Sequence, residues 1–357
     1  FRVPTLCFSK LINNVFSAMT NSYPISRVAS TLCLLCVLIV TSCSSNSLNQ
    51  ADYSLTLPSA RIETREAPSP EELAEKTKVV ILGTGTPIPD AFRAGSSIAV
   101  IHKGQSYLFD VGSGAIRQAT IARYKYDIPS LYPSQICCVF LSHLHSDHIM
   151  DLSELAHTLW WRRGNGLQAW GPIGVEPIAN TLDELISIDA NFRINGVQPV
   201  TNPDGFRVDA ATITPGILLH EDDLTIEAFL VDHGDIDPAF GFKITTNDLS
   251  VVISGDTAYS EVIAEKARGV DLLFHEVISR KGLEQNSPGF QRYHNSVHTT
   301  SDELARLARI AQPKKLVLYH GLFYGTAESS VLNEIEALYD GEVILANDLD
   351  VFTTDSR

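Results

Sequence analysis

Three histidines and one aspartate crowd into the segment Ser142–His148, which reads SHLHSDH. The apolar residues 136–141 before it predict a buried strand, and residues 149–155 after it have the period of a helix. Titratable groups crowded beside a buried strand must be paired or coordinated, and neutral imidazole with carboxylate is a ligand set that zinc, manganese and iron accept. We therefore expect a catalytic centre for two metal ions here, rather than a solvated histidine-rich loop.

Three later residues of ligand type also stand where a predicted strand ends. The apolar runs 224–231, 249–253 and 316–319 are followed by His233, Asp256 and His320, respectively. Side chains at the carboxyl ends of strands can converge on one edge of a sheet. These three residues are therefore candidates to complete the centre that begins at His143.

The pattern His-x-His-x-Asp-His, followed by single His, Asp and His residues at strand ends, resembles the metallo-β-lactamase superfamily of hydrolases. The opening LGTGTP at residues 82–87, the segment FHE at 274–276, and His298 ahead of a helix resemble its ribonuclease Z-like branch. The resemblance covers about residues 78–353. It implies an α/β fold, the four-layer αβ/βα metallo-β-lactamase sandwich.

The resemblance also assigns the ligands of two divalent ions, expected to be zinc, with manganese or iron as alternatives. The first ion would be held by His143, His145 and His233, the second by Asp147, His148 and His320, and Asp256 would bridge both. Asp110, at the end of a predicted strand, could orient one ligand imidazole or be an ordinary turn residue.

Two further side chains complete the expected chemistry, in which water activated between the metal ions attacks the substrate. Asp147 would orient that water or accept its proton. His298 precedes TSDE at 300–303, a capping box that predicts a helix, and would protonate the leaving group or merely lead into that helix. The resemblance suggests that Glu276 keeps His298 protonated. Two candidate lids are residues 160–166, which could instead be core tryptophans and a turn, and residues 289–293.

The substrate expected from the sequence is a small anionic ester. Ribonuclease Z enzymes carry a tRNA-gripping arm between the positions of His233 and Asp256, and this chain crosses that interval in only 22 residues. The net charge of -15 also opposes binding of nucleic acid. Armless exported members resemble an arylsulfatase type, so a sulfate or phosphate ester is expected. The alternatives are a phosphodiesterase or ribonuclease Z-type endonuclease, and a non-catalytic metal-binding surface lipoprotein.

The first 43 residues predict a lipoprotein-type signal peptide, with Met19 as the expected start. Its apolar stretch, residues 28–40, is too short to span a bilayer, and it ends in VTSC, which resembles the site where Cys43 is lipidated. An ordinary cleaved signal is the alternative. We expect a polar linker over 44–77 and a hydrolase domain over 78–357. Lipidation would hold the protein, as a monomer or a homodimer, at the periplasmic or cell-surface face of a bacterial membrane.

Two minor expectations concern His102, at the tip of a hairpin, and the neighbouring cysteines Cys137 and Cys138. Residues 97–101 and 105–109 predict a hairpin, and His102 at its tip is expected on the surface. Cys137 and Cys138 are neighbours on a predicted strand, where successive side chains point to opposite faces, so we expect no disulfide between them.

Overall fold

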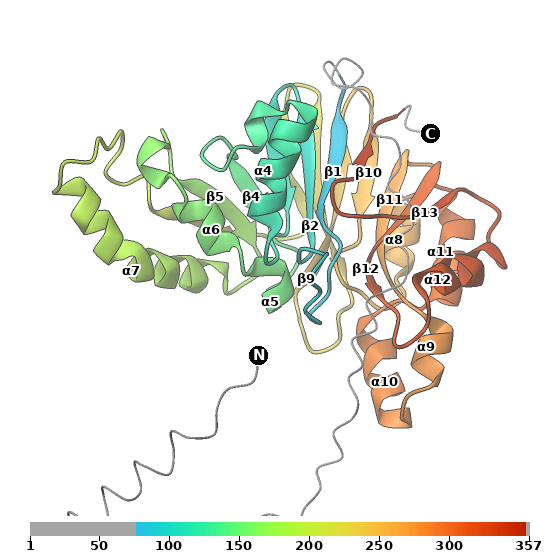
Figure 1. Ribbon diagram of the computed structural model, residues 1–357. Helices are drawn as coiled ribbons and strands as arrows, with labels where there is room; N and C mark the ends of the chain where they lie inside the picture. Colours follow the sequence, from blue (N-terminus) through green and yellow to red (C-terminus); the bar gives the residue numbers. More distant parts are fainter. Residues whose placement is uncertain (1–75, 355–357) are drawn as a thin grey trace, which may run out of the picture. The chain divides into compact units, whose positions relative to one another are not determined.

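The computed structural model describes residues 76–354, which form two seven-stranded sheets packed face to face (Figure 1). The first sheet has the order β14-β1-β2-β3-β4-β5-β6. Its strands are β1 (Lys78–Gly83), β2 (Ser97–His102), β3 (Gln105–Phe109), β4 (Cys138–Phe140), β5 (Leu167–Gly171), β6 (Val208–Thr212) and β14 (Val351–Phe352). The second has the order β13-β12-β11-β10-β9-β8-β7. Its strands are β7 (Gly216–Glu221), β8 (Leu224–Val231), β9 (Ala239–Thr245), β10 (Ser250–Ile253), β11 (Leu272–Ile278), β12 (Lys315–Leu322) and β13 (Val343–Leu345).

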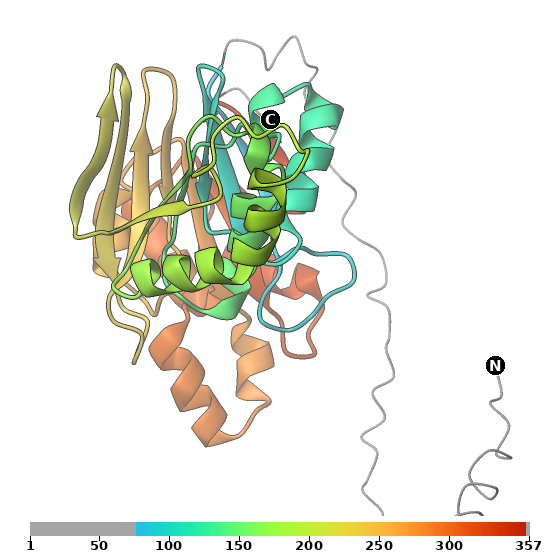
Figure 2. The ribbon, with the colours of Figure 1, turned by 90° about the vertical axis from the view of Figure 1, so that its left-hand side faces the viewer.

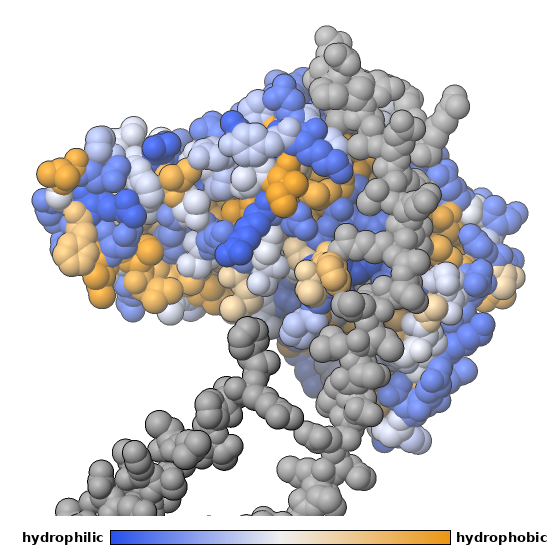
Figure 3. Space-filling model, in the orientation of Figure 1, coloured by the Kyte–Doolittle hydropathy of each residue, from blue (hydrophilic) through white to orange (hydrophobic). Residues whose placement is uncertain are grey.

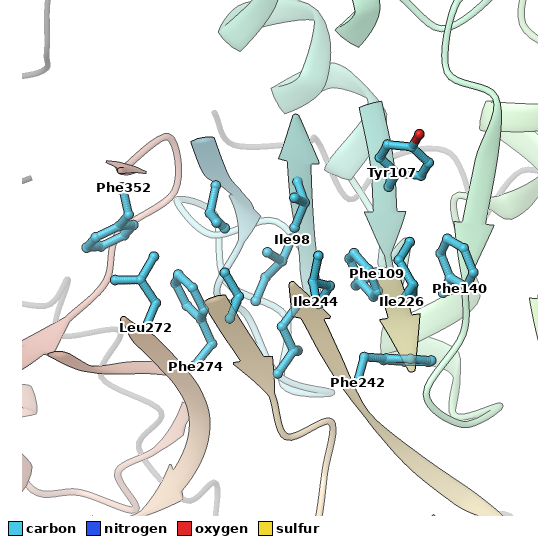
Figure 4. Packing of buried hydrophobic residues seen from close by; sticks show 14 of the residues in the cluster. Ile98, Tyr107, Phe109, Phe140, Ile226, Phe242, Ile244, Leu272, Phe274 and Phe352 are labelled. Atoms are coloured by element: carbon cyan, nitrogen blue, oxygen red, sulfur yellow. The ribbon is translucent and has the colours of Figure 1, made fainter. Parts of the chain in front are cut away.

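Alternation along each strand sends side chains to both faces of its sheet. In β1, Val79 and Ile81 enter the core between the sheets, whereas Val80 and Leu82 join the core under the outer helices. Figure 4 shows the inner core, where Phe109 of the first sheet packs on Phe242 of the second with ring centroids 5.2 Å apart. Because β1 and β2 are buried on both faces, they read as nearly continuous apolar runs in the sequence, whereas β6, β7 and β8 include polar and exposed residues.

Helices cover the outer face of each sheet. Those associated with the first sheet are α4 (Ala115–Tyr126), α5 (Ser146–Ile149), α6 (Leu152–His157) and α7 (Val175–Ile194); short 3-10 turns lie at Pro129–Leu131 and Trp160–Arg162. Those that follow strands of the second are α8 (Glu261–Lys266), α9 (Arg280–Glu284), α10 (Pro288–Val297), α11 (Ser301–Ala311) and α12 (Glu328–Glu336). Helices α9 and α10 project beyond the sheets in both ribbon views (Figures 1 and 2). The arrangement confirms the four-layer αβ/βα sandwich.

Several local predictions are confirmed, and one is altered by packing. The β2–β3 hairpin forms, and Thr300 and Glu303 make the capping box of α11. The helix predicted over 149–155 is instead split into α5 and α6, and the carboxylate of Asp151 at the break accepts a hydrogen bond from the backbone N–H of Ile116. That contact ties the split to the start of α4.

Two expectations about hairpin and strand residues are wrong. His102 is buried, because its ring bonds Thr77 through Nδ1 (2.8 Å) and Asp223 through Nε2 (3.0 Å), which closes the gap between the two sheets. Cys137 and Cys138 are joined in a disulfide. Cys137 lies just before β4, outside the regular alternation that would have separated the two side chains.

The start of β1 is fastened at the same edge as His102. Thr77 is buried, and its backbone N–H donates to Asp248 at 2.9 Å. Its hydroxyl donates to the other carboxylate oxygen of Asp248. Asp248 lies in the turn between β9 and β10, so these bonds link the first strand of one sheet to a hairpin of the other.

In the segment 160–166, Trp160 and Arg163 are buried, whereas Arg162, Gly164 and Asn165 are exposed, which favours the alternative of core residues and a turn over that of a lid. Trp160 has no exposed surface and packs edge-on against Phe206 at 5.5 Å. The guanidinium of Arg163 is buried and donates to the backbone carbonyls of Ile136, Pro133 and Leu155 at 2.5–2.7 Å. Both side chains are therefore used to hold the chain behind β4.

Helix α7 buries one face and leaves apolar residues on the other. Leu185, Ile188 and Phe192 are 68%, 70% and 71% exposed, and Figure 3 shows apolar residues gathered over this helix. Among residues 76–354, no helix is both long enough and apolar enough to cross a membrane. The predicted signal peptide, Met19, Cys43 and nearly all of the predicted linker lie outside the described residues.

Candidate functional site

The predicted ligand residues come together where strands of both sheets end. The first group consists of His143 and His145, in the loop after β4, and His233, which follows β8. The Nε2 atom of His143 is 3.0 Å from Nδ1 of His145, and Nε2 of His233 is 3.2 Å from the same Nδ1 atom. Three ring nitrogens thus point at one small volume, as three ligands of a single ion would.

A second group lies beside the first. It comprises Asp147 and His148 of α5 and His320 of β12. Nε2 of His320 is 3.0 Å from the carboxylate of Asp147, and Nε2 of His148 is 3.5 Å from the same carboxylate. Asp256 lies between the groups, with its two oxygens 3.4 Å from Nε2 of His148 and of His320, and it also clusters with His143. The geometry therefore suits two cations with Asp256 shared.

The backbone is irregular at two site residues, His320 and Asp110, and this irregularity sets the direction of their side chains. In the pairing of β11 with β12, Glu276 faces Tyr319 and Val277 faces Gly321, so His320 is the extra residue of a bulge. His320 also has φ 46°, a left-handed conformation that is uncommon for residues other than glycine. Bulges redirect side chains, and strained conformations gather at functional sites. The bulge explains how a residue inside a strand reaches the edge of the sheet.

Asp110 contacts His148, as the orienting alternative that the sequence left open predicts. It too has a positive φ, 57°, and its carboxylate is buried. One oxygen accepts from the backbone N–H of Ser142 at 2.7 Å, and the other lies 2.7 Å from the Ser142 hydroxyl and 2.8 Å from Nδ1 of His148. An N–H at Nδ1 leaves Nε2 of His148 as the free ligand atom, and that atom faces Asp147 and Asp256.

The protonation states of the first group fit a cation. Burial lowers the pKa of His143, of His145 and of His233, the last to about 4, so the imidazoles are neutral as ligands must be. Burial opposes ionisation of Asp256, but the imidazoles of His320 and His148 outweigh it and hold its pKa well below the ordinary value. At His148, burial would lower the pKa, but the carboxylates of Asp256 and Asp110 outweigh burial and raise it well above the ordinary value. Nε2 of His148 and Oδ1 of Asp256 are buried without a hydrogen-bond partner, as expected of atoms meant for a metal.

His298 and Glu276 form a pair next to the metal ligands. Nδ1 of His298 is 3.4 Å from the carboxylate of Glu276 and 4.0 Å from that of Asp256. Burial alone would lower the pKa of His298, but Glu276 and then Asp256 outweigh burial and raise it above the ordinary value. Glu276 is fixed by a hydrogen bond from the backbone N–H of Thr299 at 2.7 Å. The pair can therefore hold a proton beside the metal centre.

Sequence reasoning missed Tyr324, which is linked to His298 through His294. Tyr324, in the loop after β12, brings its hydroxyl 3.1 Å from Nε2 of His294, whose ring stacks on His298 with centroids 5.5 Å apart. No local pattern marks Tyr324, because the contact joins α10 to a loop far away in the chain. The second candidate lid, residues 289–293, is the first part of α10, and its Phe290 packs on the Tyr324 ring at 5.0 Å.

Comparison with known proteins places the chain in a family. Residues 106–321 match the model of the beta-lactamase superfamily domain. A protein named ribonuclease Z from Mycolicibacterium gilvum (strain PYR-GCK) is 32% identical over 64% of this chain and 80% of its own length. The crystal structure of the short form of human tRNase Z has a TM-score of 0.57 at 20% identity, covering 78% of this chain and 100% of that one.

A third comparison concerns a metal-bound relative of the same fold. The zinc-bound structure of PqqB from Methylobacterium extorquens has a TM-score of 0.55 at 16% identity and covers 77% of this chain and 99% of that chain. At such low identity the likeness shows the fold alone. Together with the family match and the converging His and Asp side chains, these findings show that the chain belongs to the metallo-β-lactamase superfamily of metal-dependent hydrolases and has ribonuclease Z-like relatives.

Proposed function

We propose that the protein is a metal-dependent phosphodiesterase that hydrolyses a P–O bond of a phosphate diester. The observation that carries this proposal is a donor set for two cations with a separate proton-holding pair, His298 and Glu276, at its side. The relatives named ribonuclease Z support phosphate over sulfate as the reacting group. The aryl sulfate favoured by the sequence reading has no such support, and it stays in the assay below as a competitor.

In the proposed reaction each proton has a place in the site. Two divalent cations, zinc in the simplest case, would lower the pKa of water between them and neutralise charge on the phosphoryl oxygens. The carboxylate of Asp147 accepts the proton of the attacking water as the new P–O bond forms. The bond to the leaving oxygen breaks, and His298 donates a proton to that oxygen. Glu276 favours the protonated form of His298 before the reaction.

The size of the substrate is a separate part of the proposal. The interval between His233 and Asp256 contains only the β9–β10 hairpin and its flanking turns, which supports a small diester rather than a tRNA precursor. A ribonuclease Z-type endonuclease is the second candidate, and the names of the relatives favour it. The two candidate functions differ in their preferred substrate. An endonuclease would cleave a polynucleotide faster than a small molecule with one phosphodiester bond.

The deciding experiment assays the metal-quantified protein in parallel on five substrates. These are an aryl phosphodiester, an aryl phosphomonoester, an aryl sulfate, a β-lactam and a 3′-extended tRNA precursor. We expect the highest kcat/KM on the phosphodiester and none after chelation of the metal. Fastest cleavage of the aryl sulfate would overturn the preference for phosphate. Absence of hydrolysis with both metal ions bound would favour the non-catalytic metal-binding alternative.

One substitution tests whether His298 serves catalysis rather than metal binding. His298→Ala should lower kcat by about 10²–10⁴-fold, because it removes the general acid. Its metal content should stay near that of wild type. His220→Ala is the matched control, since His220 is exposed on β7, and it should change neither quantity. Equal turnover of His298→Ala and wild type would remove the proton-donor role.

Export with a lipid anchor at Cys43 is a further part of the proposal, and it rests on the sequence VTSC. In a bacterial host, a fatty-acid label should enter the wild-type protein and the control Cys36→Ser but not Cys43→Ser. Labelling of Cys43→Ser would show that this cysteine is not the anchor. Neither result bears on the phosphodiesterase assay, which uses the purified protein.

A further inference from the structure

A cavity of about 270 Å³ lies between the loop after β1 and the loop after β12. The second part of the lining begins at Gly321, the residue of β12 directly after His320, and continues into the loop that follows the strand. The first loop returns to the body at Gly95, where a Cβ atom would come within 2.9 Å of the backbone oxygen of Asp147. Asp147 and His320 are themselves 3.0 Å apart. Both walls of the cavity therefore continue from the Asp147–His320 side of the candidate metal centre.

The same side of the centre holds the candidate proton donor. The ring of His298 is 5.9 Å from that of His320 and stacks on His294. His294 in turn meets the hydroxyl of Tyr324, a lining residue of the cavity. Tyr324 has φ 43°, and its packing against Phe290 and His294 supports this strained conformation. A leaving group that takes a proton from His298 would lie toward this cavity.

The lining of the cavity combines apolar side chains with polar ones, and its one cationic side chain is paired. Ile88, Phe323 and Tyr324 supply apolar and aromatic walls. The Nη2 atom of Arg93 donates hydrogen bonds to both carboxylate oxygens of Glu328, at 2.8 and 2.9 Å. Its other terminal nitrogen, Nη1, donates to the hydroxyl of Thr84, also a lining residue. The positive charge is thus satisfied within the wall.

The balance of charge in the lining disfavours a second phosphate. Its charged residues are Arg93, Asp90 and Glu328, so one positive charge stands against two negative charges, a net charge of -1. A cavity wall with this charge repels an anion, and the net charge of the whole chain, -15, has the same sign. The cavity suits an uncharged ring better than a phosphate-bearing strand.

We infer that this cavity is the leaving-group subsite and that it takes an uncharged, apolar or aromatic alcohol released from a diester with a single phosphate. The inference rests on the proposed phosphodiesterase function and deepens it. The cavity selects small diesters with a hydrophobic leaving group, and Ile88 and Tyr324 contact that group. The Arg93–Glu328 pair keeps the wall from binding a further phosphate.

The first test measures binding without catalysis. Binding of 4-methylphenol, which is uncharged at neutral pH, to the folded, metal-loaded protein is measured by ligand-observed NMR for wild type, Ile88→Asp and Ile121→Asp. Ile88 is 60% exposed at the cavity, and Ile121 is 49% exposed on α4, away from its lining. A charge in place of Ile88 should weaken binding about tenfold, the equivalent of one lost apolar contact of this size. Ile121→Asp should bind like wild type, and equal affinity in all three proteins would overturn the subsite.

The second test measures discrimination during turnover. Two aryl phosphodiesters are compared, identical except that one carries an additional phosphate on its leaving ring. Wild type should prefer the uncharged ring, and Glu328→Gln, which frees Arg93, should raise relative kcat/KM for the phosphorylated ring about twofold to fivefold. Glu336→Gln removes the same charge from the exposed end of α12 and should leave the ratio unchanged.

The two tests keep the inference apart from the function it rests on. Hydrolysis of both diesters with the same ratio in wild type, Glu328→Gln and Glu336→Gln would overturn the subsite and leave the phosphodiesterase function standing. Binding of 4-methylphenol that Ile88→Asp weakens, without hydrolysis of any diester, would overturn the function and retain a cavity for an aryl alcohol.

Discussion

Replacing Asp110 by Asn tests whether one carboxylate sets the tautomer of a metal ligand. The two oxygens of Asp110 serve the Ser142 backbone N–H, the Ser142 hydroxyl and Nδ1 of His148. Asn offers only one oxygen, and its NH₂ group must take the other place. In one orientation NH₂ opposes the backbone N–H of Ser142. In the other it donates to Nδ1 of His148 and drives the imidazole proton onto Nε2, the atom that faces Asp147 and Asp256.

Either orientation should weaken metal binding. Partners that orient a ligand imidazole are worth about 10–100-fold in metal affinity, which corresponds to about 1.4–2.7 kcal/mol. We expect the loss mainly in the ion held by Asp147, His148 and His320, because Asp110 contacts His148 directly. Zinc affinity is measured by competition with a chromophoric chelator, which resolves the weaker of two bound ions from the tighter one.

Asp271→Asn is the matched control for this experiment. Asp271 likewise accepts from a serine backbone N–H and hydroxyl, those of Ser250 at 2.8 and 2.6 Å, and from Lys314 at 2.6 Å. It precedes β11 and so lies at the edge of the sheet opposite the site. The control should lose stability without losing zinc. Unchanged zinc affinity in Asp110→Asn, or an equal loss in the control, would refute the reasoning.

Three further predictions concern the proton donor, an inter-sheet contact and a buried cation. Glu276→Gln should move the alkaline limb of the pH profile of kcat/KM to lower pH, because the pKa of His298 falls when the carboxylate is lost; an unmoved limb would contradict the pairing. The hydrogen bond from Lys103 lowers the pKa of Asp223 to about 2, so its stabilisation is present above about pH 4 and lost as the pH falls toward about 2. Urea titrations should therefore show the stability difference between wild type and Asp223→Asn shrinking over that range. Arg163→Met leaves three buried carbonyls unpaired and should lower the free energy of unfolding by about 2–5 kcal/mol in denaturant titrations, whereas a loss below about 1 kcal/mol would contradict this account.

The sequence predicted the parts of the site that depend on local pattern. Strand ends are visible as apolar runs that stop at a polar residue, and this placed His233, Asp256 and His320 near the 143–148 loop. The assignment of these residues to two cations came from the family resemblance. The bulge at His320 could not be foreseen, since it depends on the register between β11 and β12.

What sequence reasoning missed depends on contacts between distant segments. His102 has the sequence context of an exposed hairpin tip, yet Asp223 of the other sheet covers it. The sequence left open whether Trp160 and Arg163 belong to a lid or to the core, and only the burial of Trp160 and the hydrogen bond from Arg163 to Leu155 of α6 decide for the core. The Arg93–Glu328 pair joins residues 235 positions apart, and no periodic pattern in the sequence indicates it.

The fastening of Thr77 sets the place where force from the preceding chain would enter the described body. Thr77 is bonded to Asp248 at the rim remote from His143 and His320. A load arriving ahead of β1 would therefore be borne first by the β9–β10 turn, and the residues that do chemistry would bear it last.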